Sequence, residues 1–122
     1  MADFSVDVKL VGADTAAISI HGFLDANTFE DFDSALNRLF EDSIYKIAID
    51  FGGLEYVSSA GAGVLIGASS IARENGGEIV IVGAKGEVKE VFELLGINRL
   101  FKIVGDMSRG LNILGVKDGA AS

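Results

Sequence analysis

Cysteine and proline are both absent from this chain of 122 residues, and His21 is its only histidine. Without cysteine the chain can form no disulfide and no cysteine metal site, which favours a cytoplasmic protein. Without proline, every connection must be made by glycine and polar turn residues. His21 lies in a stretch typical of a strand, and no acids or histidines have metal-ligand spacing. We therefore expect no catalytic site, no metal and no cofactor.

Long apolar runs are missing as well. No stretch approaches the ~20 apolar residues of a membrane helix, and the N-terminus lacks the basic start and apolar run of a signal peptide. The net charge is −8, and residues 1–61 account for all of it with 11 acids and 3 bases. This acidity argues against nucleic acid or an anionic membrane as a partner. The acids serve either solubility or docking to a basic protein surface.

The spacing of apolar residues predicts nine helices and strands. Alternating and continuous apolar runs predict strands over 4–11, 15–23, 45–51, 78–83 and 100–105. Helical spacing predicts helices over 27–42, 61–75, 87–96 and 108–115, the first of them capped by Asn27. The order ββαβαβαβα predicts an α/β fold, with about five strands in a mixed sheet, helices mainly on one side and the first strand at an edge. We expect one domain over 1–115 and a frayed tail over 116–122.

Two adjacent serines, Ser58 and Ser59, stand between a loop expected over 52–57 and the helix that follows. One of them is the natural N-cap of this helix, because a hydroxyl accepts hydrogen bonds from the free N–H groups there. The same N–H groups and the positive end of the helix dipole would also attract a phosphate. A phosphoserine at this position would not unfold the chain, which suits a switch.

The glycines of the same segment, Gly61, Gly63 and Gly67, nearly form a dinucleotide-binding fingerprint. The last gap is one residue too long, and the strand before them is expected to end well upstream, near Phe51. Small residues that allow the helix to pack close to the sheet explain the pattern better. Nucleotide binding nevertheless stays open as an interpretation.

The stretch IDFGGLEYVSSAGAGVLIGA (49–68) resembles the strand, loop and helix signature of STAS domains, specifically the stand-alone bacterial anti-sigma-factor antagonists. GFLDANTF (22–29) resembles the second motif of this family. By position, the phosphoacceptor serine of the family falls on Ser59, and the aspartate before it falls on Ser58, which becomes a second candidate acceptor. The residues expected at a partner-binding face are Asp25, Asn27, Tyr56, Ser58, Ser59, Gly61 and Ala62.

The resemblance implies a binding module and not an enzyme. In this family the unphosphorylated domain binds an anti-sigma factor that is also a serine kinase, and so releases the sigma factor. We expect this protein to be a monomer when free. Phosphorylation of the serine breaks the complex, and a serine phosphatase restores it. Two alternatives stay open, namely a STAS scaffold or regulator in another signalling or transport assembly, and an enzyme or nucleotide binder of similar α/β order.

Overall fold

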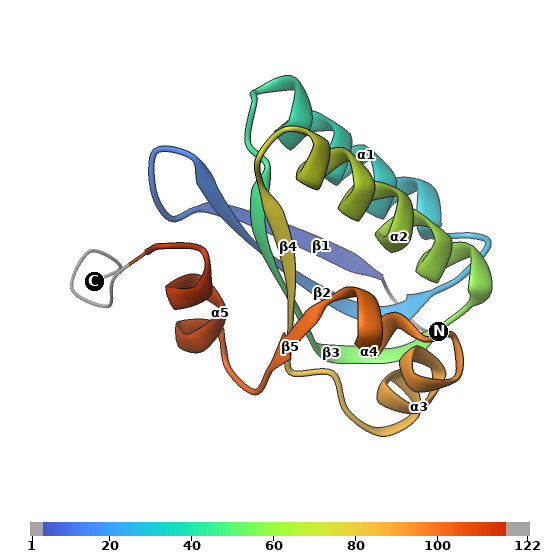
Figure 1. Cartoon of the computed structure of the whole chain (residues 1–122). Coiled ribbons are helices and arrows are strands. Elements are labelled where there is room, and N and C mark those ends of the chain that lie inside the picture. The colour runs from blue at the N-terminus through green and yellow to red at the C-terminus, as the bar shows by residue number, and fades with distance from the viewer. Residues whose placement is uncertain (1–3, 117–122) are drawn as a thin grey trace.

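The computed structural model describes residues 4–116, which form a five-stranded mixed sheet with helices packed against it (Figure 1). The strands are β1 (Ser5–Leu10), β2 (Thr15–Leu24), β3 (Lys46–Val57), β4 (Glu78–Val82) and β5 (Lys102–Val104), and they lie in that order across the sheet. β1 is antiparallel to β2, and the other neighbours are parallel. The helices are α1 (Phe29–Glu41), α2 (Ser59–Glu74), α3 (Gly86–Leu94), α4 (Ile97–Leu100) and α5 (Met107–Ile113). The predicted fold class and the edge position of β1 are confirmed.

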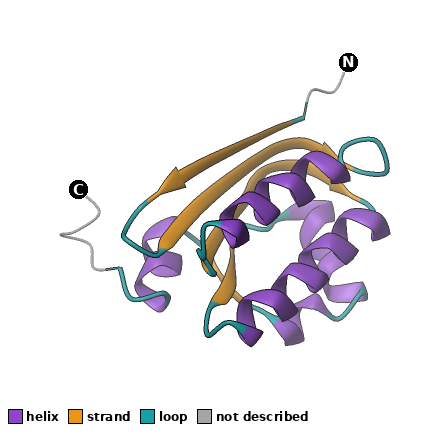
Figure 2. Cartoon of the chain, turned by 90° about the horizontal axis from the view of Figure 1, so that it is seen from above, coloured by secondary structure: helices purple, strands orange, loops and turns teal. Residues whose placement is uncertain are grey.

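The sheet carries its helices mainly on one side, as expected. α1 and α2 lie next to each other over one face, and α5 packs on the opposite face (Figure 2). Strand β4 shows why both faces need cover. Its residues Ile79 and Ile81 belong to the large core under α1 and α2, whereas Val80 and Val82 pack with α5. Alternate residues of a strand point to opposite faces, so a strand covered on both sides reads as a continuous apolar run.

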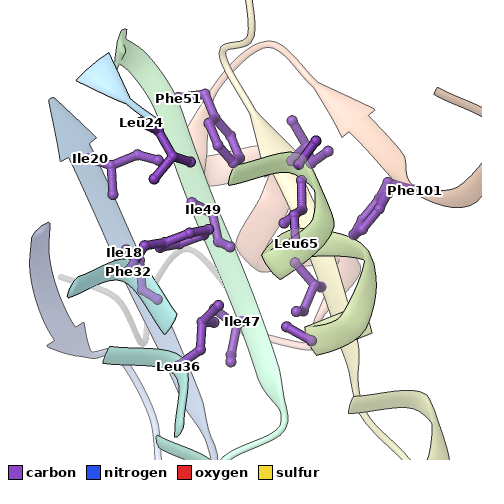
Figure 3. Packing of buried hydrophobic residues seen from close by; sticks show 14 of the residues in the cluster. Ile18, Ile20, Leu24, Phe32, Leu36, Ile47, Ile49, Phe51, Leu65 and Phe101 are labelled. Carbon is purple, nitrogen blue, oxygen red and sulfur yellow. The ribbon is translucent and has the colours of Figure 1, made fainter. Parts of the chain in front are cut away.

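The main core lies between the sheet and the first two helices. Phe32 and Leu36 of α1 are four residues apart, so they point to the same side, toward Ile18 and Ile47 of the sheet (Figure 3). Leu65 of α2 points into the same core, and all five side chains are at most 1% exposed. Full burial of one such side chain contributes about 1.5–3 kcal/mol, so this layer contributes strongly to holding α1 and α2 on the sheet.

Strand β3 is longer than the strand expected over 45–51, because it continues through the expected loop to Val57. A glycine pair, Gly52–Gly53, suggests a turn in the sequence. In the structure Gly53 lies under the ring of His21, and a Cβ atom there would come within 2.2 Å of His21 Cδ2. The glycine therefore makes room for a neighbouring side chain, and β3 goes on pairing with β2 through two register shifts.

The chain differs from the prediction at two further places. Asn27 is not an N-cap, since α1 begins after Thr28. A short helix that was not predicted, α4, precedes β5 and includes Leu100, the first residue of the strand expected over 100–105. It follows Gly96, whose φ of 75° turns the chain, and it buries Ile97 completely. Of the expected tail, only Val116 falls within the described residues.

Small residues at the start of α2 bring this helix close to the end of β2. A Cβ atom on Gly61 would lie 2.6 Å from Leu24 Cγ and 3.2 Å from the Leu24 carbonyl oxygen. Gly63 and Gly67 are exposed, and a Cβ atom on either would meet nothing within 4 Å. The expected packing role of the glycines is therefore confirmed for Gly61 and wrong for the other two.

This difference predicts opposite effects of two substitutions in one helix. Gly61→Ala should lower the free energy of unfolding by about 1–3 kcal/mol, because the methyl group overpacks against Leu24. Gly63→Ala, the matched control, should raise it by about 0.5–1 kcal/mol, because alanine favours an exposed helix position over glycine. Urea unfolding followed by circular dichroism measures both. Equal effects of the two changes would contradict the close contact between α2 and β2.

Candidate functional site

The two motifs of the sequence meet at one end of the sheet, where β2 and β3 end together. Leu24 pairs with Val57, and the N–H of Ser58 donates to the carbonyl oxygen of Leu24 at 2.9 Å. β2 then leads into the turn that contains Asp25, while β3 leads into α2, which begins at Ser59. The parallel pairing of two strands therefore brings Asp25 and the two serines, more than 30 residues apart in the chain, to one end of the sheet.

Ser58 and Ser59 occupy different positions at the start of α2. Ser58 is the N-cap, and its Oγ accepts a hydrogen bond from the N–H of Gly61 at 3.3 Å. Its carbonyl oxygen accepts the first helical bond, from Ala62 at 2.9 Å. Ser58 is half-buried, whereas Ser59 is the first residue of the helix and is exposed. The expectation that one serine caps the helix is confirmed, and the capping residue is Ser58.

The start of α2 offers a favourable environment for an anion. The N–H groups of Ser59 and Ala60 lie in the first turn, where the helix supplies no acceptor for them. The first turn of this 16-residue helix also contains no acidic residue. Free N–H groups and the positive end of the helix dipole both favour negative charge. A negatively charged group on the Ser59 side chain would therefore lie next to stabilising donors.

Asp25 shapes the turn before α1. Its Oδ1 accepts from the N–H of Asn27 at 2.9 Å, and its own N–H donates to Thr28 Oγ1 at 2.9 Å. The Thr28 hydroxyl donates in turn to the carbonyl oxygen of Phe23 at 2.7 Å. Asp25 is half-buried and Asn27 is exposed. Thr28 was not among the expected site residues, although an aspartate followed three residues later by threonine before a helical pattern is typical of such turns.

An exposed aromatic pair lies beside the serines. Phe23 of β2 is paired with Tyr56 of β3, and their ring centroids are 6.0 Å apart. The two residues are 37% and 40% exposed. Tyr56 was expected at the partner-binding face, whereas Phe23 was missed. The available signal was its position in β2, where Phe23 follows Ser19 and His21 on the side of the strand that faces away from the main core.

Gly61 and Ala62 have a different role from the one expected. Both are buried, and Ala62 is only 2% exposed. Gly61 packs against Leu24, and Ala62 belongs to the main core. In this structure their positions are taken up by internal packing, so neither residue is a surface contact for a partner.

A carboxyl group with a shifted pKa lies at the other end of the sheet, and the described residues contain neither a metal site nor a membrane-spanning helix. Hydrogen bonds from Lys46 and Thr15 lower the pKa of the Asp14 carboxyl, but these residues lie where β2 and β3 begin. Within residues 4–116, no group of three His, Cys, Asp or Glu side chains is arranged to hold a metal ion. The same residues contain no helix long and apolar enough to cross a membrane.

The two serines should affect stability differently. Ser58→Ala should lower the free energy of unfolding by about 1 kcal/mol, because the N–H of Gly61 loses its capping partner. Ser59→Ala, the matched control, should change it by less than about 0.5 kcal/mol, because it replaces an exposed side chain. Chemical denaturation of both variants makes the comparison. A larger loss for Ser59→Ala than for Ser58→Ala would show that the cap is wrongly assigned.

Comparison with known proteins identifies the family. The sequence pattern of the STAS domain matches residues 7–109. BtrV of Bordetella bronchiseptica, provisionally named an anti-sigma factor antagonist, is 29% identical over 84 residues, which are 69% of this chain and 72% of BtrV. The anti-sigma-B factor antagonist of Staphylococcus aureus is 23% identical over 86 residues, 70% of this chain and 80% of that protein.

Solved structures agree on the fold. The anti-sigma factor antagonist SpoIIAA in its unphosphorylated form superposes with a TM-score of 0.80 at 17% identity, over 89% of this chain and 95% of SpoIIAA. The phosphorylated form of SpoIIAA from Bacillus gives a TM-score of 0.73, over 89% of this chain and 98% of the other. With the family pattern covering most of its length, this chain belongs to the STAS domain family.

Proposed function

We propose that this protein is an anti-sigma factor antagonist that binds an anti-sigma factor in its unphosphorylated form and thereby releases a sigma factor. Three findings support the proposal. The chain belongs to the STAS family, its relatives include a named anti-sigma-B factor antagonist, and its exposed serine begins a helix at one end of the sheet. On this proposal the domain acts by binding and catalyses no reaction itself.

The exposure of Ser59 is the observation that carries the proposed switch. A kinase must reach the oxygen that it modifies, and Ser59 is exposed at the first position of α2. The oxygen of Ser58 is instead engaged in capping, because it accepts the N–H of Gly61. We therefore assign Ser59 as the phosphoacceptor, with Ser58 as the residue that shapes the helix start.

The role of Ser58 as a cap explains how this chain can differ from the family motif. The family aspartate that precedes the acceptor is replaced here by Ser58. Aspartate and serine are about equally good N-caps, because the side chain of each carries an oxygen that accepts from the first turn. The replacement therefore keeps the capping bond to Gly61 and removes only a negative charge beside Ser59.

A phosphate on Ser59 would change the binding surface mainly through its charge. It would add about −1.5 to −2 charges to the half of the chain that already carries all of the net −8. The neighbouring exposed aromatic rings of Phe23 and Tyr56 suit a closely packed interface, and an added dianion would disturb their burial. A cost of about 3 kcal/mol corresponds to a loss of roughly a hundredfold in affinity.

The proposed partner is an anti-sigma factor that carries serine kinase activity, and a separate serine phosphatase would return the protein to its binding form. The partner surface should be basic. α1, which starts next to the site, has Glu30 and Asp31 in its first turn, and Asp33 is exposed on the same helix. Opposite charges across an interface accelerate association and exclude wrong partners, which fits a cytoplasmic exchange between complexes.

A second candidate function is a STAS scaffold or regulator in another signalling or transport assembly. Two departures from the family motif favour it, namely Ser58 in place of the family aspartate and Ala60 in place of the serine or threonine that follows the acceptor in the family. A domain that is never phosphorylated does not need the acceptor sequence. The two candidates differ in whether Ser59 receives a phosphate, and the same experiment therefore tests both.

Phosphate mapping tests the acceptor. We expect the native protein, incubated with its cognate anti-sigma kinase and ATP, to be phosphorylated on Ser59, and Ser58→Ala to be modified at the same residue. Ser59→Ala should remain unmodified, because the remaining hydroxyl of Ser58 is half-buried and engaged as a cap. Mass spectrometry of the proteolytic peptides locates the phosphate.

Two outcomes would contradict this expectation, and they differ in what they leave standing. Phosphate on Ser58 alone would refute the assignment of Ser59 and leave a phosphorylation switch in place. A native protein that binds the kinase but receives phosphate on neither serine would favour the scaffold function.

A further inference from the structure

Strand β1 leaves one edge of the sheet open. It pairs with β2 on one side, and it is the first strand in the sheet order, so the other side has no neighbouring strand among the described residues (Figure 2). All of its six residues are exposed except Val6, which is half-buried. An exposed edge of this length presents unpaired N–H and C=O groups that can pair with another strand.

The two faces of β1 differ in character. Val8 pairs with Ile18 of β2, so it lies on the side of α1 and the main core, and it is 44% exposed. Leu10, on the same side, is 59% exposed. These residues line an open groove of about 610 Å³ between β1 and α1. The other side of the strand carries Asp7 and Lys9, whose neighbours across β2 are uncharged. The edge therefore combines uncovered apolar residues with two opposite charges.

We propose that β1 pairs with β1 of a second copy of this chain, antiparallel and about a two-fold axis at Val8, so that two sheets join into one. The sequence of β1 is complementary to itself in this register. Asp7 of each copy stands opposite Lys9 of the other, Val8 opposite Val8, and Val6 opposite Leu10. Residues directly opposite in an antiparallel pair share a face and contact each other, and opposite charges in such pairs are favourable.

Other registers are less favourable for physical reasons. An axis at Asp7 or at Lys9 places two like charges directly opposite each other. A shift by one residue is excluded, because antiparallel pairing of the same edge of two copies keeps both sheets the same way up, so that residues of one face of β1 can stand opposite only residues of that same face. Parallel pairing of the same edge turns the second copy over, so Val8 and Leu10 of one copy share a face with Asp7 and Lys9 of the other. Only the antiparallel register at Val8 matches charges and apolar residues together, and this match is why we assign the edge to a second copy.

This dimer goes beyond the proposed function and replaces the expectation that the free protein is a monomer. It is also compatible with the candidate site. Ser59 follows β3, which is separated from the open edge by β2, and β3 is not part of the proposed pairing. Each protomer of the dimer would therefore keep its serine site.

The test is sedimentation equilibrium of the full chain from micromolar to near-millimolar concentrations. The native protein should form a reversible dimer. Asp7→Lys and Lys9→Asp should each weaken the dimer by about tenfold or more, because two attractive pairs become repulsive. Glu90→Lys, an exposed residue of α3, is the control for the change in net charge and should leave the dimer in place.

Two combinations distinguish lost pairing from lost folding. The double variant Asp7→Lys with Lys9→Asp should dimerise like the native protein, because both pairs are restored with reversed sign. An equimolar mixture of the two single variants should form the mixed dimer, in which each lysine again meets an aspartate. A native protein that is monomeric at every concentration would overturn the proposal, as would a dimer that neither single reversal weakens.

Discussion

The contact between the start of α2 and the end of β2 determines the geometry of the whole site. The N–H of Ser58 donates to the carbonyl oxygen of Leu24, and Gly61 lets the helix approach close enough for that bond to form. Leu24 and Ala62, the residue that follows Gly61, both belong to the main core. Because the first turn of α2 is held in this way, Ser59 is displayed at a defined position and not on a loose loop.

This arrangement suits a switch that changes binding without changing the fold. The capping bond of Ser58 and the packing of Gly61 lie on the inner side of the helix start, whereas Ser59 is exposed. A phosphate on Ser59 would meet free N–H groups of the first turn, so the helix itself would tolerate it. The cost would fall on a complex in which a partner covers the serine and the aromatic pair of Phe23 and Tyr56.

The architecture was predictable from local patterns, but several decisive details were not. Periodicity located all five strands and four of the five helices, because buried faces impose it on the sequence. The continuation of β3 past Gly53 depends on the ring of His21, which comes from a different strand. The turn before α1 is held in part by the hydrogen bond that the Thr28 hydroxyl donates to the carbonyl oxygen of Phe23. No spacing rule reveals a contact between two strands, whereas the spacing of Asp25 and Thr28 was a signal for the turn before α1.

The candidate site was predictable to a similar degree. The motif resemblance pointed to Ser58, Ser59 and Asp25, and parallel pairing of β2 and β3 brings their segments together. Which serine caps and which is exposed could not be decided, because a sequence pattern does not locate the start of a helix to a single residue. Gly61 and Ala62 were expected at the surface, and their burial follows from the approach of α2 to β2.

The central claim is that the charge state of Ser59 controls binding to an anti-sigma factor. The most direct measurement is calorimetric titration of the anti-sigma partner with the native protein in two forms, unphosphorylated and phosphorylated on Ser59. The account predicts that the unphosphorylated form binds at least about a hundredfold more tightly, which is near 3 kcal/mol. Equal affinities of the two forms would contradict it.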